Sequence, residues 1–264
     1  MQEFELSEVK PGLKKILLIG HEGSGKTHFI GTMPKPIYFF SFDKGYATLA
    51  GEKGIKVGLC MDLDRQRPTA FSDFEKKFNQ LMAGEMYTHP DGKQEPYKTI
   101  AFDNISFLST YLYDHLQAIN SNIDKPGGYA VYGALKSKMK DFINRAVGIA
   151  QFVVATALVE TEKDELSGEI FDIPSTEGKI RNELGAWFDA VFFMQVNKRG
   201  DQCNYELLTV GDRRKKAKVR VPSSINKVIN AKEVPDFRVI YSKIRNASKQ
   251  IDEAKQKENS DAKN

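Results

Sequence analysis

Lys15-Ile16-Leu17-Leu18-Ile19, followed at once by Gly20-His21-Glu22-Gly23-Ser24-Gly25-Lys26-Thr27, is the stretch that decides the fold. The first run is short and apolar, as in a buried parallel strand, and the second is a complete Gly-x-x-x-x-Gly-Lys-Thr phosphate loop. Its glycines let backbone N–H groups and the start of the next helix point at a phosphate. We expect Lys26 to reach the β- and γ-phosphates and the Thr27 hydroxyl to hold Mg²⁺. The predicted nucleotide-binding residues are Gly20, His21, Glu22, Gly23, Ser24, Gly25, Lys26, Thr27 and His28.

The rest of the chain alternates strand and helix patterns, and strands gather towards its end. Apolar runs predict strands at 37–42, 55–59, 97–102 and 152–159, and amphipathic spacing predicts helices at 106–119 and 132–150. Ser72-Asp73-Phe74-Glu75 reads as a capping box that opens a helix ending near Ala83. A long polar segment over 160–179 precedes strands predicted at 190–196, 205–210 and 217–221. We therefore expect an α/β fold, a mostly parallel sheet covered by helices on both faces with a C-terminal antiparallel extension.

Composition limits the class of protein. The chain of 264 residues predicts one domain over 1–241 and a polar, charged tail over 242–264, for which a frayed helix or disorder is the default. Its two cysteines, Cys60 and Cys203, lie far apart and have no metal-ligand spacing with the four histidines, so neither a disulfide framework nor a zinc site is indicated. The most apolar stretch, 146–159, is too short and too polar to span a bilayer, and the N-terminus lacks a signal-peptide pattern. We expect a cytoplasmic protein with no membrane partner.

Three polar residues at strand ends or within strands are candidates for chemistry. Asp103 ends an apolar strand and stands where a Walker B carboxylate holds Mg²⁺. Asp43 ends the neighbouring strand and is the candidate to orient or deprotonate the attacking water, although an Asp before Lys44-Gly45 is equally expected to form a turn. Thr156 interrupts an apolar strand and either contacts the γ-phosphate or bonds to backbone as an ordinary β-former.

The nucleotide is expected to be ATP. The run Asn197-Lys198-Arg199-Gly200-Asp201 looks like the Asn-Lys-x-Asp clamp for guanine, but its Asp comes one residue too late. Asp124-Lys125-Pro126-Gly127 fits the Asp-x-x-Gly pattern of GTPases, yet no apolar strand leads into it.

A basic block at 213–220 places six cations in eight residues: Arg213, Arg214, Lys215, Lys216, Lys218 and Arg220. The overall net charge of +4 is modest, so this block is a local feature. It indicates an anionic partner, either nucleic acid or the phosphates of a neighbouring subunit's nucleotide. A solvated hairpin edge protected by its lysines is the alternative.

With these residues in this order, the chain resembles the RecA-like core ATPases, and more narrowly the small phage-encoded ATP-binding proteins that act with single-stranded DNA in annealing and recombination. The similarity runs from about Leu13 to Pro222. It implies a RecA-like P-loop NTPase core that uses ATP and Mg²⁺ in the cytoplasm of a bacterial host. In those phage proteins the second strand ends in Asp-x-Glu-x-Gly, whereas Ser41-Phe42-Asp43-Lys44-Gly45 has an Asp in place of the Glu. The shorter carboxylate bears on the rate of hydrolysis rather than on nucleotide binding.

The resemblance also implies partners. RecA-like proteins place two cations of a late strand against the nucleotide of the neighbouring subunit, and Lys218-Val219-Arg220 matches that spacing. ATP would then lie between the subunits of a homo-oligomer, with Lys218 and Arg220 stabilising transition-state charge. Two loops would face single-stranded DNA, one over 120–132, with Lys125, Gly127, Gly128 and Tyr129, and one over 160–179. The second has a poor composition for a polyanion, since it is mainly acidic.

Three functions follow as hypotheses. The first is an oligomeric, Mg²⁺-dependent ATPase that binds single-stranded DNA and assists annealing or homologous recombination. The second is a nucleotide-gated interaction protein that hydrolyses ATP slowly and loads or regulates a partner, such as a single-strand-binding or recombination protein. The third, a P-loop kinase of small metabolites, predicts an Arg-rich lid, and the cluster at 213–220 lies too late in the chain and lacks a helical frame.

Overall fold

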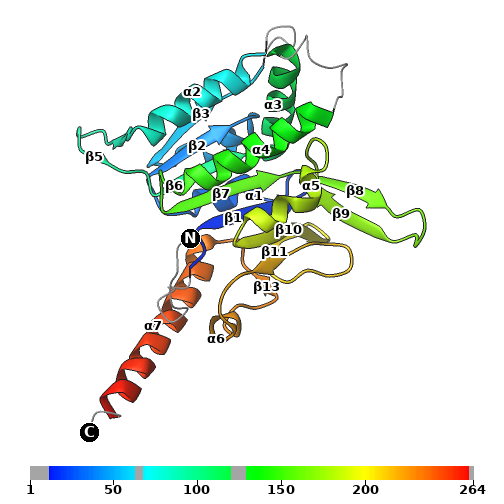
Figure 1. Ribbon diagram of the computed structural model, residues 1–264. Helices are drawn as coiled ribbons and strands as arrows, with labels where there is room; N and C mark the ends of the chain where they lie inside the picture. The colour runs from blue at the N-terminus through cyan, green and yellow to red at the C-terminus, as the bar shows by residue number, and fades with distance from the viewer. Residues whose placement is uncertain (1–11, 63–67, 120–128, 262–264) are drawn as a thin grey trace.

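The computed structural model describes residues 12–62, 68–119 and 129–261, and among them a nine-stranded sheet forms the centre of the molecule (Figure 1). Six of its strands are parallel neighbours in the order β10-β1-β7-β6-β2-β3. Their bounds are β1 (Lys15–Gly20), β2 (Ile37–Ser41), β3 (Ile55–Leu59), β6 (Thr99–Asp103), β7 (Phe152–Ala157) and β10 (Ala190–Arg199).

Three strands extend this sheet beyond β10 through antiparallel pairings. β11 (Gln202–Leu208) and β12 (Lys218–Val219) pair with β10, and β13 (Lys232–Glu233) pairs with β11. The expected C-terminal antiparallel extension is thereby confirmed, as is the mostly parallel α/β core of a P-loop NTPase.

Helices cover both faces of the sheet because successive strand residues point to opposite sides. On one face, Leu17 and Ile19 of β1 belong to the same core as α2 (Ala70–Met82), α3 (Ile105–Ile119), α4 (Tyr129–Ala146), α5 (Ile180–Glu183) and the 3₁₀ turn η3 (Leu184–Trp187). On the other, Ile16 and Leu18 pack with α1 (Lys26–Gly31), α6 (Ser223–Asn226) and α7 (Phe237–Asp261). A further 3₁₀ turn, η2 (Gly45–Leu49), follows β2.

The predicted capping box is wrong. Helix α2 begins at Ala70, so Ser72 lies inside its first turn, and no side chain of Thr69 caps it. Instead Asp62 Oδ1 accepts the backbone N–H groups of Thr69 and Ala70, both at 2.7 Å. The carboxylate of Asp62, which lies outside the helix, therefore caps α2 in place of the predicted Ser72 side chain.

Two hairpins stand outside the main sheet. β4 (Tyr87–Thr88) and β5 (Gln94–Glu95) close around the predicted turn at 89–92, and β8 (Val159–Lys163) pairs with β9 (Ile170–Pro174). The sequence interpretation treated the second of these as a polar segment without strands. Figure 1 shows β8 and β9 projecting from the body as an arm. β8 is mostly exposed, whereas Asp172, Ile173 and Pro174 of β9 are buried, so the arm has no strand with the even apolar alternation that predicts a half-buried strand.

The polar C-terminal segment forms most of α7, whose first half is anchored to the sheet. Phe237, Ile240, Ile244 and Ala247 are buried there. The predicted division after residue 241 falls inside this helix and stays a prediction. None of the helices in the described ranges is both long and apolar enough to cross a membrane.

Candidate nucleotide site

The carboxyl ends of the central parallel strands surround a cleft of about 860 Å³. β1 delivers the phosphate loop, β2 delivers Asp43, and β6 delivers Asp103, because neighbouring parallel strands end at the same edge of the sheet. The cleft is lined on this side by Glu22, Gly23, Ser24, Gly25, Lys26, Thr27, His28, Asp43, Gly45, Asp103 and Asn104. The fold therefore gathers the predicted loop and both predicted carboxylates at one place.

The phosphate loop is folded around its own lysine. Lys26 Nζ donates to the carbonyl oxygens of Gly20 at 2.7 Å and His21 at 2.8 Å, and the side chain is buried. Burial lowers the pKa of the Lys26 ammonium, and the charges of Asp103, Glu22 and Asp43 oppose that shift. A bound phosphate offers this ammonium a charged acceptor in place of two neutral carbonyls.

Local geometry of the loop requires small residues. Gly25, at φ 89°, lies in the left-handed region directly before α1, where a side chain would strain the backbone. Ser24 is buried and its Oγ has no hydrogen-bond partner among the described residues. A buried hydroxyl without a partner is costly, so this one favours an incoming acceptor such as a phosphate oxygen.

Asp103 and Thr27, the predicted Mg²⁺ ligands, are in direct contact. Thr27 Oγ1 donates to Asp103 Oδ2 at 2.7 Å, and Thr156 Oγ1 donates to Asp103 Oδ1. Only 3% of Asp103 is exposed. Burial raises the pKa of its carboxyl, while the two threonine hydroxyls lower it.

This donor set fits Mg²⁺. The ion keeps several waters and takes one or two carboxylates together with substrate phosphates, so one hydroxyl and one carboxylate beside a phosphate loop are sufficient protein ligands. Within the described ranges, no group of three or more His, Cys, Asp or Glu side chains is placed to hold a metal ion.

The hydroxyl of Thr156 bonds to Asp103 of the Thr27–Asp103 pair and, within the described residues, not to a backbone group. Its side chain is fully buried in β7, and its hydroxyl supports Asp103, an arrangement that neither sequence hypothesis anticipated. Its contact with a γ-phosphate stays a prediction.

Asp43 forms the predicted turn and also lies in the cleft, while its action on an attacking water stays a prediction. Its Oδ1 accepts the N–H of Gly45 at 2.6 Å, which forms the turn, and its Oδ2 accepts Nδ2 of Asn104 at 2.8 Å inside the cleft. A Cβ added to Gly45 would lie 2.9 Å from Asp43 Oδ1, so a larger residue there would have to displace this carboxylate from the turn.

Asn104 was missed by the sequence interpretation. It is buried, and its Oδ1 accepts the N–H of Phe107 at 2.9 Å, which caps α3 while its amide holds Asp43. An Asn directly before an amphipathic helix is a recognisable N-cap, and that signal was available in the sequence.

The opposite wall of the cleft comes from distant parts of the chain, and no local pattern pointed to it. Tyr205 of β11 lies beside the loop, with Cδ1 of its ring 3.3 Å from the position a Cβ would take on Gly25, and the residue is 48% exposed. The remaining lining comes from α1, η2, the β7–β8 connection and the segment around the start of α7: Thr32, Thr48, Leu158, Val234, Pro235, Asp236 and Arg238.

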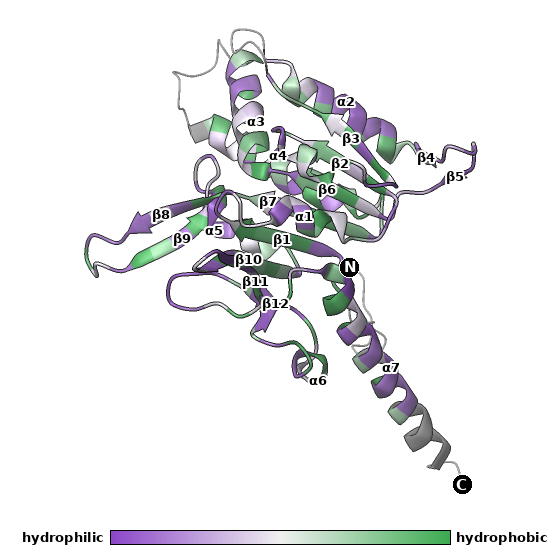
Figure 2. Ribbon diagram, turned by 180° about the vertical axis from the view of Figure 1, so that it is seen from behind, coloured by the Kyte–Doolittle hydropathy of each residue, from purple (hydrophilic) through white to green (hydrophobic). Residues whose placement is uncertain are grey.

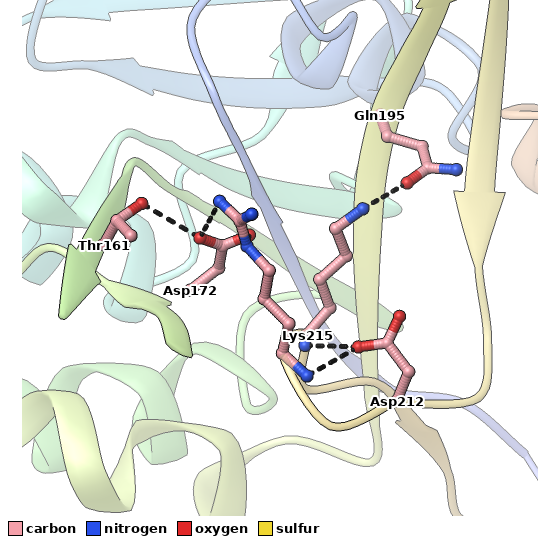
Figure 3. Close-up of polar contacts among 6 residues, drawn as sticks. Thr161, Asp172, Gln195, Asp212 and Lys215 are labelled. Carbon is pink, nitrogen blue, oxygen red and sulfur yellow. Dashed lines mark hydrogen bonds and ion pairs between the residues drawn. The ribbon is translucent and has the colours of Figure 1, made fainter. Parts of the chain in front are cut away.

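Two cations of the basic block are used within the chain (Figure 3). Arg214 holds the buried carboxylate of Asp172 through Nε at 2.8 Å and Nη2 at 3.0 Å, and Thr161 donates to the same carboxylate at 2.9 Å. Lys215 Nζ donates to Gln195 Oε1 at 2.6 Å. The contact between Arg214 and Asp172 ties the basic loop to the β8–β9 arm, and the contact between Lys215 and Gln195 ties it to β10. The other four cations of the block make no ion pair with the described residues: Arg213, Lys216, Lys218 and Arg220.

Lys218 and Arg220 do not lie in the cleft of their own chain. β12 pairs with Ala190 and Val191, which stand beside Ile16 and Leu17 at the start of β1. The phosphate loop begins three residues further along β1, about 10 Å away at the rise of a strand. Burial and the nearby Arg220 charge lower the pKa of Lys218.

Of the two loops predicted to face DNA, the structure describes the second in full and only the end of the first. Residues 120–128 of the first lie outside the described residues. The second contains the β8–β9 arm, whose acidic side chains other than the buried Asp172 are exposed or partly exposed, and Arg181 pairs with Glu162 at 2.5 Å and Glu160 at 3.8 Å.

A comparison with protein-family models gives a match over most of the chain. A family model described as an AAA domain covers residues 13–221, which is more than half of the chain and includes the loop, all three candidate carboxylate and threonine positions, and β12. No curated protein matches the chain.

Proposed function

The chain belongs to the AAA domain family, and we propose that it is a Mg²⁺-dependent ATPase that binds single-stranded DNA and assists strand annealing or homologous recombination. The proposal includes the narrower likeness to phage-encoded annealing ATPases, a homo-oligomer with nucleotide between subunits, and action in the cytoplasm of a bacterial host. The observation that carries the ATPase part is the hydrogen bond between Thr27 and Asp103 in the cleft that holds Lys26 and Asp43.

Each residue of the cleft has a role in this proposal. The loop N–H groups, Ser24 and Lys26 bind the phosphates, and Thr27 with Asp103 would hold Mg²⁺, which neutralises phosphate charge. Thr156 positions Asp103, and Asn104 positions Asp43. Asp43 orients the attacking water or takes its proton.

The alternative is a nucleotide-gated interaction protein with slow hydrolysis that loads or regulates a replication or recombination partner. The acidic β8–β9 arm favours it, because an arm of this charge repels DNA and suits a protein partner. The direct hydrogen bonds that engage both oxygens of Asp43 also favour slow turnover, since they compete with water for the carboxylate.

The test is steady-state ATP hydrolysis by the wild-type protein and Lys26→Ala, with Mg²⁺, with and without single-stranded DNA, at two salt concentrations. Stimulation by DNA that disappears in the variant supports the DNA-coupled ATPase. Slow turnover that does not respond to DNA supports the gated interaction protein. Full ATP binding by Lys26→Ala contradicts the phosphate-loop assignment itself.

A further inference from the structure

A second groove, of about 830 Å³, runs along α7 on the α1 side of the sheet. Buried residues on one side of α7 fix the helix to the core, and its neighbouring side faces the groove. The helix contributes Arg238, Tyr241, Ser242, Arg245, Asn246 and Lys249, which recur at spacings of three and one and therefore share one side. Figure 2 shows that α7 is largely hydrophilic beyond its anchored start.

The groove is cationic. Lys35, Arg238, Arg245 and Lys249 line it, and Glu52 is the one acid among its described lining residues. Glu52 is paired with Lys35 at 2.6 Å, and Arg238 is paired with Asp236, whereas Arg245 and Lys249 are exposed and make no ion pair within the described part of the chain. Unpaired cations at successive turns of one helix concentrate positive potential along a line.

This groove is continuous with the nucleotide cleft. His28, Thr32, Thr48 and Arg238 line both. The N–H of Phe237, the first residue of α7, donates to Thr32 Oγ1 at 2.9 Å, which joins α7 to the end of the helix that follows the phosphate loop. A ligand in the groove and a nucleotide in the cleft therefore contact shared residues.

We propose that the α7 groove binds the phosphate backbone of single-stranded DNA, with Arg245 and Lys249 contacting phosphates. The inference rests on the proposed DNA-binding function and gives it a location different from the acidic β8–β9 arm. The charge of the groove and its length along an exposed helix fit a linear polyanion. The shared residues give nucleotide binding a direct route to alter DNA affinity.

The experiment measures fluorescence anisotropy of labelled oligo(dT) at several salt concentrations with the full chain. The test variant is Arg245→Glu with Lys249→Glu, and the matched control is Lys76→Glu with Lys140→Glu, two exposed lysines on the opposite face with the same change of charge. We expect the test variant to raise Kd about tenfold and to reduce the salt slope by about 1.4, since each lost contact with a single strand removes about 0.7. The control keeps the wild-type slope.

The outcomes separate the groove from the function. A wild-type protein that fails to bind oligo(dT) at low salt overturns the DNA-binding function together with the groove. Wild-type binding that both variants weaken equally overturns the groove alone, because net charge then explains the loss. Unchanged DNA affinity with a lower mass by light scattering shows that the groove holds another copy of the chain. Arg245→Gln with Lys249→Gln, which introduces no repulsion, repeats the test if the charge-reversed variant unfolds.

Discussion

Asp103 places stability and function in conflict at a single carboxylate. Its burial raises the pKa, so the folded chain binds this proton more tightly than the unfolded chain does. Unfolding then releases a proton, and the free energy of unfolding falls as pH rises from the ordinary Asp value of 3.8 through the raised pKa of the folded state. Mg²⁺ reverses the balance because it requires the charged form.

Replacing Asp103 by Asn therefore has opposite effects with and without ligand. Without nucleotide we expect Asp103→Asn to be more stable than wild type at neutral pH, with a gap that closes below the ordinary pKa of Asp. With Mg²⁺ and ATP at a hundred times Kd, wild type gains about 2.7 kcal/mol and the variant gains much less. Thermal unfolding across pH, with and without Mg²⁺ and ATP, measures both effects. A variant less stable than wild type, by a margin that grows with pH, contradicts the assigned direction of the pKa.

Residue positions were predictable from sequence where their partners are local. The phosphate loop is a contiguous pattern, and Asp43 and Asp103 each follow an apolar strand, so parallel-sheet geometry brings them together. Tyr205 could not be found in this way. It reaches Gly25 only because β11 folds back along β10, which lies next to β1. Thr156 was identified as a candidate by its polarity, but its hydrogen bond to Asp103 on the neighbouring strand β6 was not predicted.

At the scale of elements, the start of α2 depends on an acceptor that local sequence rules do not identify. Asp62 Oδ1 receives two backbone N–H groups, whereas Ser72 and Glu75 have the spacing of a capping box in the wrong place. We expect Asp62→Ala to lower the free energy of unfolding by about 1 kcal/mol, as loss of a helix cap does. Ser72→Ala should have little effect, since its side chain is exposed on α2.

Urea denaturation of these variants measures the difference, with Asp62→Asn as the matched control because it keeps one acceptor oxygen. If Ser72→Ala lowers the free energy of unfolding as much as Asp62→Ala does, the predicted capping box at Ser72 is right and the assignment of Asp62 as the cap is wrong. The same limit on sequence reasoning applies to the β8–β9 arm, whose strands pair with each other outside the main sheet and which is held by the contact between Asp172 and Arg214, 42 residues apart. Neither the pairing of β8 with β9 nor the contact between Asp172 and Arg214 produces the alternation of apolar and polar residues by which a strand is predicted from sequence.

At the scale of the whole molecule, the polarity of the sheet separates two basic features. The phosphate loop lies at the carboxyl ends of the parallel strands, and β12 lies towards their amino ends. Lys218 and Arg220 therefore act on a nucleotide only if it belongs to a second copy of the chain. This geometry makes the proposed role of the two cations dependent on assembly.

The trans arrangement predicts complementation between two inactive variants. Lys218→Ala with Arg220→Ala should bind ATP but hydrolyse it at least about a hundredfold more slowly, because transition-state charge loses its cations. Lys26→Ala has the opposite defect, so mixing the two should restore part of the activity at interfaces that combine an intact loop with intact cations. Arg213→Ala with Lys216→Ala, which alters exposed cations of the same block, is the control and should keep its activity. No restoration at any mixing ratio, together with a monomeric mass in ATP, contradicts catalysis between subunits and leaves Lys218 and Arg220 as ordinary surface charges.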